Sequence, residues 1–185
     1  MFRALWLLIE TFGSLLATAC ILRALAWRGQ LSPRNPIMQF VIAATDWIVK
    51  PFRKVLPSSR TNDWASMAAA LVVALLLAIV WSLLSAQGRA PVFGGVLLLA
   101  VFWVLKWSIY LVIGLVLVQA LMSWVNPHAP LAPVVDQLTR PFLAPFRRFV
   151  PLVGGVDLSP LVLIVVAQVL LTLLESAFVS LVAIP

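Results

Sequence analysis

Apolar residues along this chain gather into long runs, and polar, basic loops separate the runs. Two of them, 2–27 and 64–85, are each long enough to cross a membrane core of about 30 Å at 1.5 Å per residue. Two further stretches of similar character cover about 102–125 and 159–182. The pattern predicts an all-α membrane protein with four transmembrane helices.

The third apolar run is longer than one crossing. It covers 92–125 and exceeds the hydrocarbon thickness by about 20 Å at the helical rise. We expect the span itself to begin near residue 102, with 92–101 as an interfacial or re-entrant piece that the chain enters through Gly94 and Gly95. A single, steeply tilted helix is the alternative.

The loop segments 36–56 and 131–150 carry apolar residues at helical spacing, with basic residues between them. Such a moderately apolar, basic stripe is typical of a helix that lies in the membrane interface. Pro141 and Pro145 remove amide donors from the second segment, so we expect no continuous helix there. The stripes comprise Ile37, Val41, Ala44, Ile48, Phe52 and Val55 in the first segment and Leu131, Val135, Leu138, Phe142 and Phe149 in the second.

The second half of the chain repeats the first. The first box, K-P-F-R-K-V-L-P at 50–57, matches the second box, A-P-F-R-R-F-V-P at 144–151, at a constant offset of 94 residues. The same offset places Asp63 on Asp157, and Arg23 aligns with Gln119 at an offset of 96. The sequence therefore predicts two copies of a two-helix unit, 1–86 and 92–185, that run in the same orientation about an axis along the membrane normal.

In each copy a Pro-Phe-Arg-basic box precedes a short loop, an aspartate and a long apolar run, and this arrangement resembles the YggT family of small integral membrane proteins. The second copy carries the family pattern in full, whereas the first lacks the Gly pair and the Ser-Pro. The resemblance implies a bacterial inner-membrane protein. The family's associations with cytochrome cofactor attachment, nucleoid or division organisation and osmotic tolerance imply an assembly or scaffold role.

Composition and charge agree with a membrane protein. Of the 185 residues, 63% are hydrophobic and 10% are charged, against about a quarter charged in an average soluble domain. The net charge is +7, and the basic residues crowd into the loops 28–63 and 125–157, while the opposite side has Arg3 and Arg89. The positive-inside rule places both large loops in the cytoplasm and both termini on the other side. Direct nucleic-acid binding, which needs a solvated basic face with exposed aromatics, is disfavoured.

Three charged residues inside the spans, Glu10, Lys106 and Glu175, are the first candidates for function. Counted from the span ends, they reach about the same depth. A lone charge in hydrocarbon costs about 2.5 to 3.5 kcal/mol, so we expect the three to pair and lock the repeats together. A proton or cation pathway is one alternative, and a Lys106 side chain that merely snorkels upward is another.

The boxes are the second candidates. One interpretation is a topology anchor, in which each cation contributes about 1 kcal/mol by meeting anionic headgroups. The other is a shaped cytoplasmic surface that docks another membrane protein, because headgroup attraction alone does not require a fixed proline frame. Asp157 or Ser159 can cap the fourth span. The residues concerned are Pro51, Phe52, Arg53, Lys54, Pro145, Phe146, Arg147, Arg148 and Asp157.

The inventory of reactive residues argues against an enzyme. His128 has no second metal ligand at a useful spacing, and no lysine follows Gly154 and Gly155 as a phosphate-binding loop would require. We therefore expect no catalytic residue, cofactor or metal. The leading hypothesis is a non-enzymatic scaffold whose partners are membrane lipids and other membrane proteins, with a homo-oligomer as a further option. The alternative is a small cation or proton transport or osmotic-tolerance element that uses the intramembrane charges.

Overall fold

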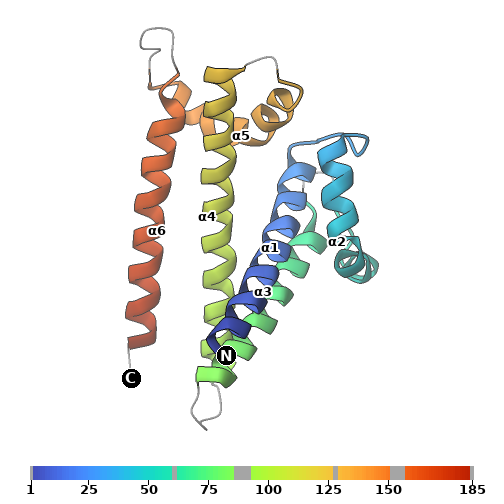
Figure 1. Cartoon of the computed structure of the whole chain (residues 1–185), viewed down its shortest axis with the longest axis vertical. Helices are drawn as coiled ribbons and strands as arrows, with labels where there is room; N and C mark the ends of the chain where they lie inside the picture. Colours follow the sequence, from blue (N-terminus) through green and yellow to red (C-terminus); the bar gives the residue numbers. More distant parts are fainter. Residues whose placement is uncertain (1, 60–61, 86–92, 127–128, 151–156, 184–185) are drawn as a thin grey trace. The chain divides into compact units, whose positions relative to one another are not determined.

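The computed structural model is helical in the part of the chain that it describes, which comprises residues 2–59, 62–85, 93–126, 129–150 and 157–183 (Figure 1). Four of its helices are long and apolar enough to cross a membrane. These four, α1, α3, α4 and α6, confirm the predicted all-α membrane class. The elements are α1 (Phe2–Arg28), α2 (Pro36–Val55), α3 (Trp64–Ser85), α4 (Phe93–Val125), α5 (Ala132–Arg147) and α6 (Ser159–Ala183).

One uninterrupted helix, α4, covers 33 residues. The predicted separate piece before residue 102 was therefore wrong, and the alternative of a single helix is correct. Gly94 and Gly95 lie in the first turn of α4, where they leave the later hydrogen bonds intact. No proline follows within the helix to remove an amide donor. At 1.5 Å per residue α4 is about 50 Å long.

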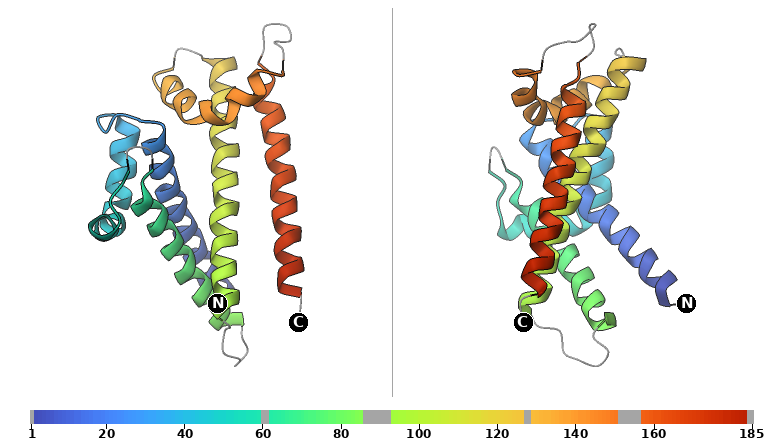
Figure 2. Two further views of the ribbon diagram at one scale, coloured as in Figure 1. Left: turned by 180° about the vertical axis from the view of Figure 1, so that it is seen from behind. Right: turned by 90° about the vertical axis from the view of Figure 1, so that its left-hand side faces the viewer.

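Helix α5 continues through its two prolines, Pro141 and Pro145. The expectation that they forbid a continuous helix was wrong. Each proline removes one amide donor, and the helix changes direction along its length instead of ending (Figure 2). Burial of Val134, Leu138 and Leu143 on its inner face favours the helical conformation despite the lost hydrogen bonds.

The chain divides into two compact units, Met1–Ser108 and Ile109–Pro185, and α4 contributes to both. In the first unit α1 and α3 lie side by side (Figure 1). A Cβ atom at Gly13 of α1 would lie 2.7 Å from Leu77 Cδ1 of α3. Small residues let helix backbones approach closely in a membrane. The buried face of α3 comprises Ala65, Ser66, Ala69, Ala70, Val73, Ala74, Leu77 and Ala78.

Tryptophan rings gather where α1 begins and α3 ends. The ring centroids of Trp6 and Trp81 are 4.9 Å apart, and those of Trp6 and Trp103 are 6.5 Å apart. Trp103 lies in turn 5.9 Å from Trp107. These contacts tie the first part of α4 to the α1–α3 pair.

The inner face of α2 differs from the predicted apolar stripe. Its buried residues are Met38, Val41, Thr45 and Val49, of which only Val41 belongs to that stripe. A polar residue, Thr45, is included because it hydrogen-bonds a side chain of α1. The large side chains of Phe40 and Trp47 remain exposed on the outer side.

In the second unit, α5 lies across the ends of α4 and α6 (Figure 2). A buried core of Val116, Leu143, Leu163 and Ala167 joins the three helices. Phe146 of the second box is half-buried and packs on this core. Its ring therefore holds α5 in place within the unit.

Candidate functional site

A buried arginine lies near the end of α1 and contacts α2. Arg23 is 1% exposed, and its guanidinium donates from Nη1 to Thr45 Oγ1 at 2.8 Å and from Nη2 to Asp46 Oδ1 at 2.9 Å. Its Nε lies 3.9 Å from Oδ2 of the buried Asp63. A buried charge without a partner is costly, so the two nearby carboxylates compensate for the burial of the Arg23 guanidinium.

Asp63 joins the end of α2 to the start of α3. Its Oδ2 accepts from Arg53 Nη2 at 3.0 Å and from the Ser66 hydroxyl at 2.7 Å, and its Oδ1 accepts from the Ser66 amide at 3.3 Å. A carboxylate at a helix N-terminus satisfies free amides and complements the helix dipole. The half-buried arginine of the first box is therefore paired within its own repeat.

The other side of Arg53 is covered by an aromatic ring. The Trp27 ring centroid lies 5.4 Å from Arg53 Cζ, which is within cation–π range. The Trp27 indole N–H donates to the Ser59 carbonyl at 3.0 Å. The end of α1, the end of α2 and the following loop are thereby joined around one guanidinium.

The second repeat builds the same junction with a neutral side chain. Gln119, which aligns with Arg23, accepts from Thr139 Oγ1 at 2.8 Å and donates from Nε2 to Asp136 Oδ1 at 3.1 Å. Thr139 aligns with Thr45. Asp136, however, aligns with an isoleucine of the first repeat, one helical turn away from the position of Asp46. The aspartate of the second repeat therefore lies one helical turn earlier than that of the first, and Gln119 still donates a hydrogen bond to it.

The Arg–Asp pair of the first repeat recurs in the second. Arg147 Nε donates to Asp157 Oδ2 at 2.9 Å, and Arg147 Nη1 lies 3.5 Å from Asp136 Oδ1. Asp157 Oδ1 accepts from the Ser159 amide at 2.9 Å, which confirms the expected cap of the fourth span. Burial alone would raise the pKa of Asp157, but hydrogen bonds from Ser159 and Arg147 outweigh burial and hold the pKa below its ordinary value.

The two polar networks carry opposite formal charges. The first network holds three cations and two carboxylates, which makes +1, whereas the second holds one cation and two carboxylates, which makes −1. The hydrogen bond from Lys50 is the largest cause that holds the pKa of Asp46 below its ordinary value, and Arg23 adds to it. The first network comprises Arg23, Lys50, Arg53, Asp46 and Asp63, and the second Arg147, Asp136 and Asp157.

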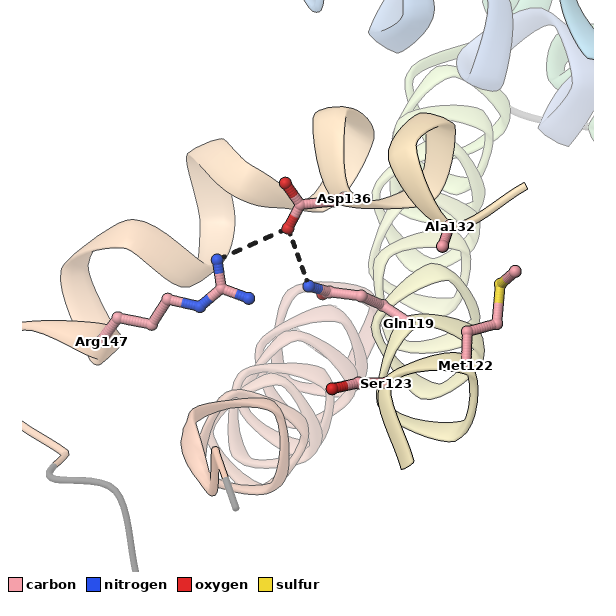
Figure 3. A pocket seen from close by; sticks show the side chains of 6 residues that line it. All are labelled: Gln119, Met122, Ser123, Ala132, Asp136 and Arg147. Atoms are coloured by element: carbon pink, nitrogen blue, oxygen red, sulfur yellow. Dashed lines mark hydrogen bonds and ion pairs between the residues drawn. The ribbon is translucent and has the colours of Figure 1, made fainter. Parts of the chain in front are cut away.

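A pocket of about 180 Å³ opens beside the second network, where α4 and α5 meet (Figure 3). Arg147 and Asp136 lie on one side of it, and α4 forms the other side. The lining residues are Gln119, Met122, Ser123, Ala132, Asp136 and Arg147.

The predicted box residues thus divide into two groups. The first arginine of each box pairs inside its own repeat, and the two phenylalanines are half-buried. The next basic residue, Lys54 or Arg148, is exposed, as are Pro51 and Pro145. The side chains that follow are apolar and exposed, Val55 by 78% and Phe149 by 84%.

The structure places the intramembrane charges on three helices. Glu10 is exposed on α1 and forms no ion pair among the described residues, while Lys106 and Glu175 are half-buried on α4 and α6. The Lys106 ammonium lies 5.7 Å from the ring centroid of Phe102. Glu175 belongs to the second unit and the other two to the first, so the predicted cluster of all three stays a prediction.

Some sequence expectations fall beyond the described residues, namely those on Arg89, His128, Gly154 and Gly155. Within the ranges that the structure describes, no group of three or more His, Cys, Asp or Glu side chains could hold a metal ion. The expected absence of enzymatic activity stays a prediction.

Sequence reasoning missed the networks as sites. The sequence indicates Arg23 only through its alignment with Gln119, and no motif marks its partners Thr45 and Asp46 on α2. The available signal was Thr45 and Thr139, the same residue at the same place in both copies, each facing an aligned polar residue of the preceding span.

Four apolar spans, two amphipathic helices and two polar junctions define a multi-pass membrane protein built from a repeated unit. The family model CCB3/YggT matches residues 2–84 and 98–178, so the chain belongs to the CCB3/YggT family. This match confirms both the resemblance and the two repeats.

Two bacterial proteins illustrate what the chain is similar to. One is "Uncharacterized protein in proC 3'region" of Vibrio alginolyticus, 33% identical over 162 residues that cover 87% of this chain and 88% of the relative. Another is "Uncharacterized protein YggT" of Escherichia coli (strain K12), 34% identical over 143 residues that cover 74% of this chain and 70% of the relative. No solved structure matches the chain.

Proposed function

We propose that the protein is a non-enzymatic assembly or scaffold factor of the bacterial inner membrane that docks another membrane protein through its two boxes. The observation that carries the proposal is the repeated ion pair between the box arginine and the aspartate ten residues later, Arg53 with Asp63 and Arg147 with Asp157. Each pair fixes a box on the start of the next span. A diffuse anionic surface would not require this fixed geometry.

Each fixed box presents a cation beside an exposed apolar side chain, Lys54 with Val55 and Arg148 with Phe149. An exposed apolar group next to a cation fits a partner segment that is apolar and acidic. The proposal places both boxes in the cytoplasm and both termini on the far side, because the basic residues crowd into the loops 28–63 and 125–157.

The test uses the exposed residues, because a change at Arg147 would also break ion pairs within the chain. Arg148→Lys keeps the charge but removes the forked guanidinium that carboxylates recognise. We expect crosslinking and affinity capture from native membranes to recover less partner with Arg148→Lys and with Arg148→Ala. Arg140→Lys is the matched control, since Arg140 is an exposed residue of α5 outside the box.

Headgroup anchoring makes a different prediction for the same variants. A diffuse anionic surface responds to charge, so Arg148→Lys would behave like the unchanged protein and only Arg148→Ala would lose capture. That combination would overturn specific docking and leave electrostatic anchoring as the better account.

A further inference from the structure

The two repeats differ at one position in a way that opens space in the second. In the first repeat the indole ring of Trp27 covers the Arg53 guanidinium. Ser123 aligns with Trp27, and Arg147 aligns with Arg53. The pocket lies beside Ser123 and Arg147 (Figure 3). By this alignment, Ser123 stands beside the pocket where the first repeat carries an indole ring.

In the pocket, the N–H donors of a guanidinium group lie next to a carboxylate. The Arg147 side chain is 37% exposed and that of Asp136 is 44% exposed. Arg147 Nε is used by Asp157 and its Nη1 faces Asp136. Its other terminal nitrogen, Nη2, points toward Gln119 and Ser123 (Figure 3). This leaves Nη2 positioned to donate to a ligand in the pocket.

The local charge selects among ligands. Arg147 already faces two carboxylates, Asp136 and Asp157, so the second network has one excess negative charge. A ligand that brings only a negative charge is repelled by that excess. A ligand that brings a phosphate and a hydrogen-bonding ammonium together complements both Arg147 and Asp136.

We propose that this pocket binds the headgroup of phosphatidylethanolamine. The phosphate accepts from Arg147 Nη2 and the Ser123 hydroxyl, and the ammonium donates to the Asp136 carboxylate. Phosphatidylglycerol brings no cation to Asp136. The quaternary ammonium of phosphatidylcholine has no N–H to donate.

The place of the pocket favours a lipid over a soluble ligand of the same headgroup chemistry. It lies where α4, which is long and apolar enough to span the membrane, meets the amphipathic α5. Met122 and Ala132 add an apolar part to its lining. A headgroup here can keep its acyl chains in the membrane beside α4.

Native mass spectrometry of the full chain tests the proposal. The protein is loaded from vesicles that contain equal amounts of phosphatidylethanolamine, phosphatidylglycerol and phosphatidylcholine. We expect the unchanged protein to retain phosphatidylethanolamine preferentially. Ser123→Trp copies the first repeat and fills the pocket, so retention should fall at least about tenfold, as expected when charge-assisted hydrogen bonds are lost. Leu121→Trp is the matched control, because Leu121 is exposed on the same helix and does not line the pocket.

A second variant tests the ammonium contact without adding bulk. Asp136→Asn removes the negative charge, so the preference for phosphatidylethanolamine over phosphatidylglycerol should disappear. Equal retention of the three lipids by the unchanged protein, or full retention by Ser123→Trp, would overturn the proposal. Displacement of the lipid by soluble phosphoethanolamine at equal concentration would also overturn it, since the site would then serve the free headgroup.

Discussion

Replacement of Arg23 by methionine should destabilise the protein strongly, because two carboxylates of the first network depend on this arginine. The side chain is 1% exposed, bonds Asp46, and lies 3.9 Å from the buried Asp63. Methionine keeps much of the volume but donates no hydrogen bond. Asp63 would then rely on Arg53, and Asp46 on the exposed Lys50.

The expected loss of unfolding free energy can be estimated from the contacts of Arg23. Removing one partner of a buried ion pair costs about 3 to 5 kcal/mol in general. Arg53 and Lys50 compensate part of this loss, so we expect about 3 kcal/mol for Arg23→Met, at the lower end of that range. Arg23→Gln should cost less by about 1 kcal/mol, because the amide can keep a hydrogen bond with Thr45 as Gln119 does with Thr139.

Thermal unfolding in detergent measures these losses of stability. A double-mutant cycle that combines Arg23→Met with Asp46→Asn measures the interaction between the two residues. The double variant should lose less stability than the two single losses added, because each single change already breaks the shared contact. Adding Ile42→Asp to Arg23→Gln supplies an acid where the second repeat has Asp136, and should recover stability. Equal losses for Arg23→Met and Arg23→Gln, together with additive losses in the cycle, would refute the reasoning.

Four other predictions follow from single contacts or from the charge pattern. Gly13→Ala should cost about 1 to 3 kcal/mol in thermal unfolding through its clash with Leu77, and Leu77→Val in the same background should restore part of it. Because its folded-state pKa is lowered, the stability contributed by Asp157 should be present above about pH 4 and lost during acid titration below it. Lys106→Met should lower the melting temperature and, if the chain transports cations, abolish flux in liposomes. A reporter fused at Gln30 should report the cytoplasm, and one fused at the carboxy terminus the opposite side.

The spans and the repeat could be predicted because they depend on properties that the sequence carries locally. Apolar length decides whether a helix can cross a membrane, and a constant offset reveals a repeat whatever the packing. The continuity of α4 and α5 could not be predicted in the same way. A glycine pair or a proline lowers the stability of a helix, but packing of residues such as Leu138 and Leu143 decides whether the helix ends.

The sites were harder to predict, because their residues come from different helices. Arg23 meets Asp46 on α2 and Asp63 before α3, and the hydropathy pattern does not indicate which acid an arginine will reach. The boxes were predicted as surfaces, and Arg53 and Arg147, although partly exposed, are each paired with an aspartate of their own repeat. A signal was present in the equal separation of each arginine from its aspartate in the two copies.

Both copies contain the Arg–Asp pair, but the residues around the pair differ. The shared pair therefore has a structural role, and the residues that differ determine which ligand each copy can bind. In both copies the pair joins an amphipathic helix to the start of the next span. Trp27 closes the first junction, whereas Ser123 leaves the second open. Exchanging these two residues should therefore move the pocket to the first repeat without touching either pair. Because the first network carries a formal charge of +1, that pocket should then retain phosphatidylglycerol in preference to phosphatidylethanolamine.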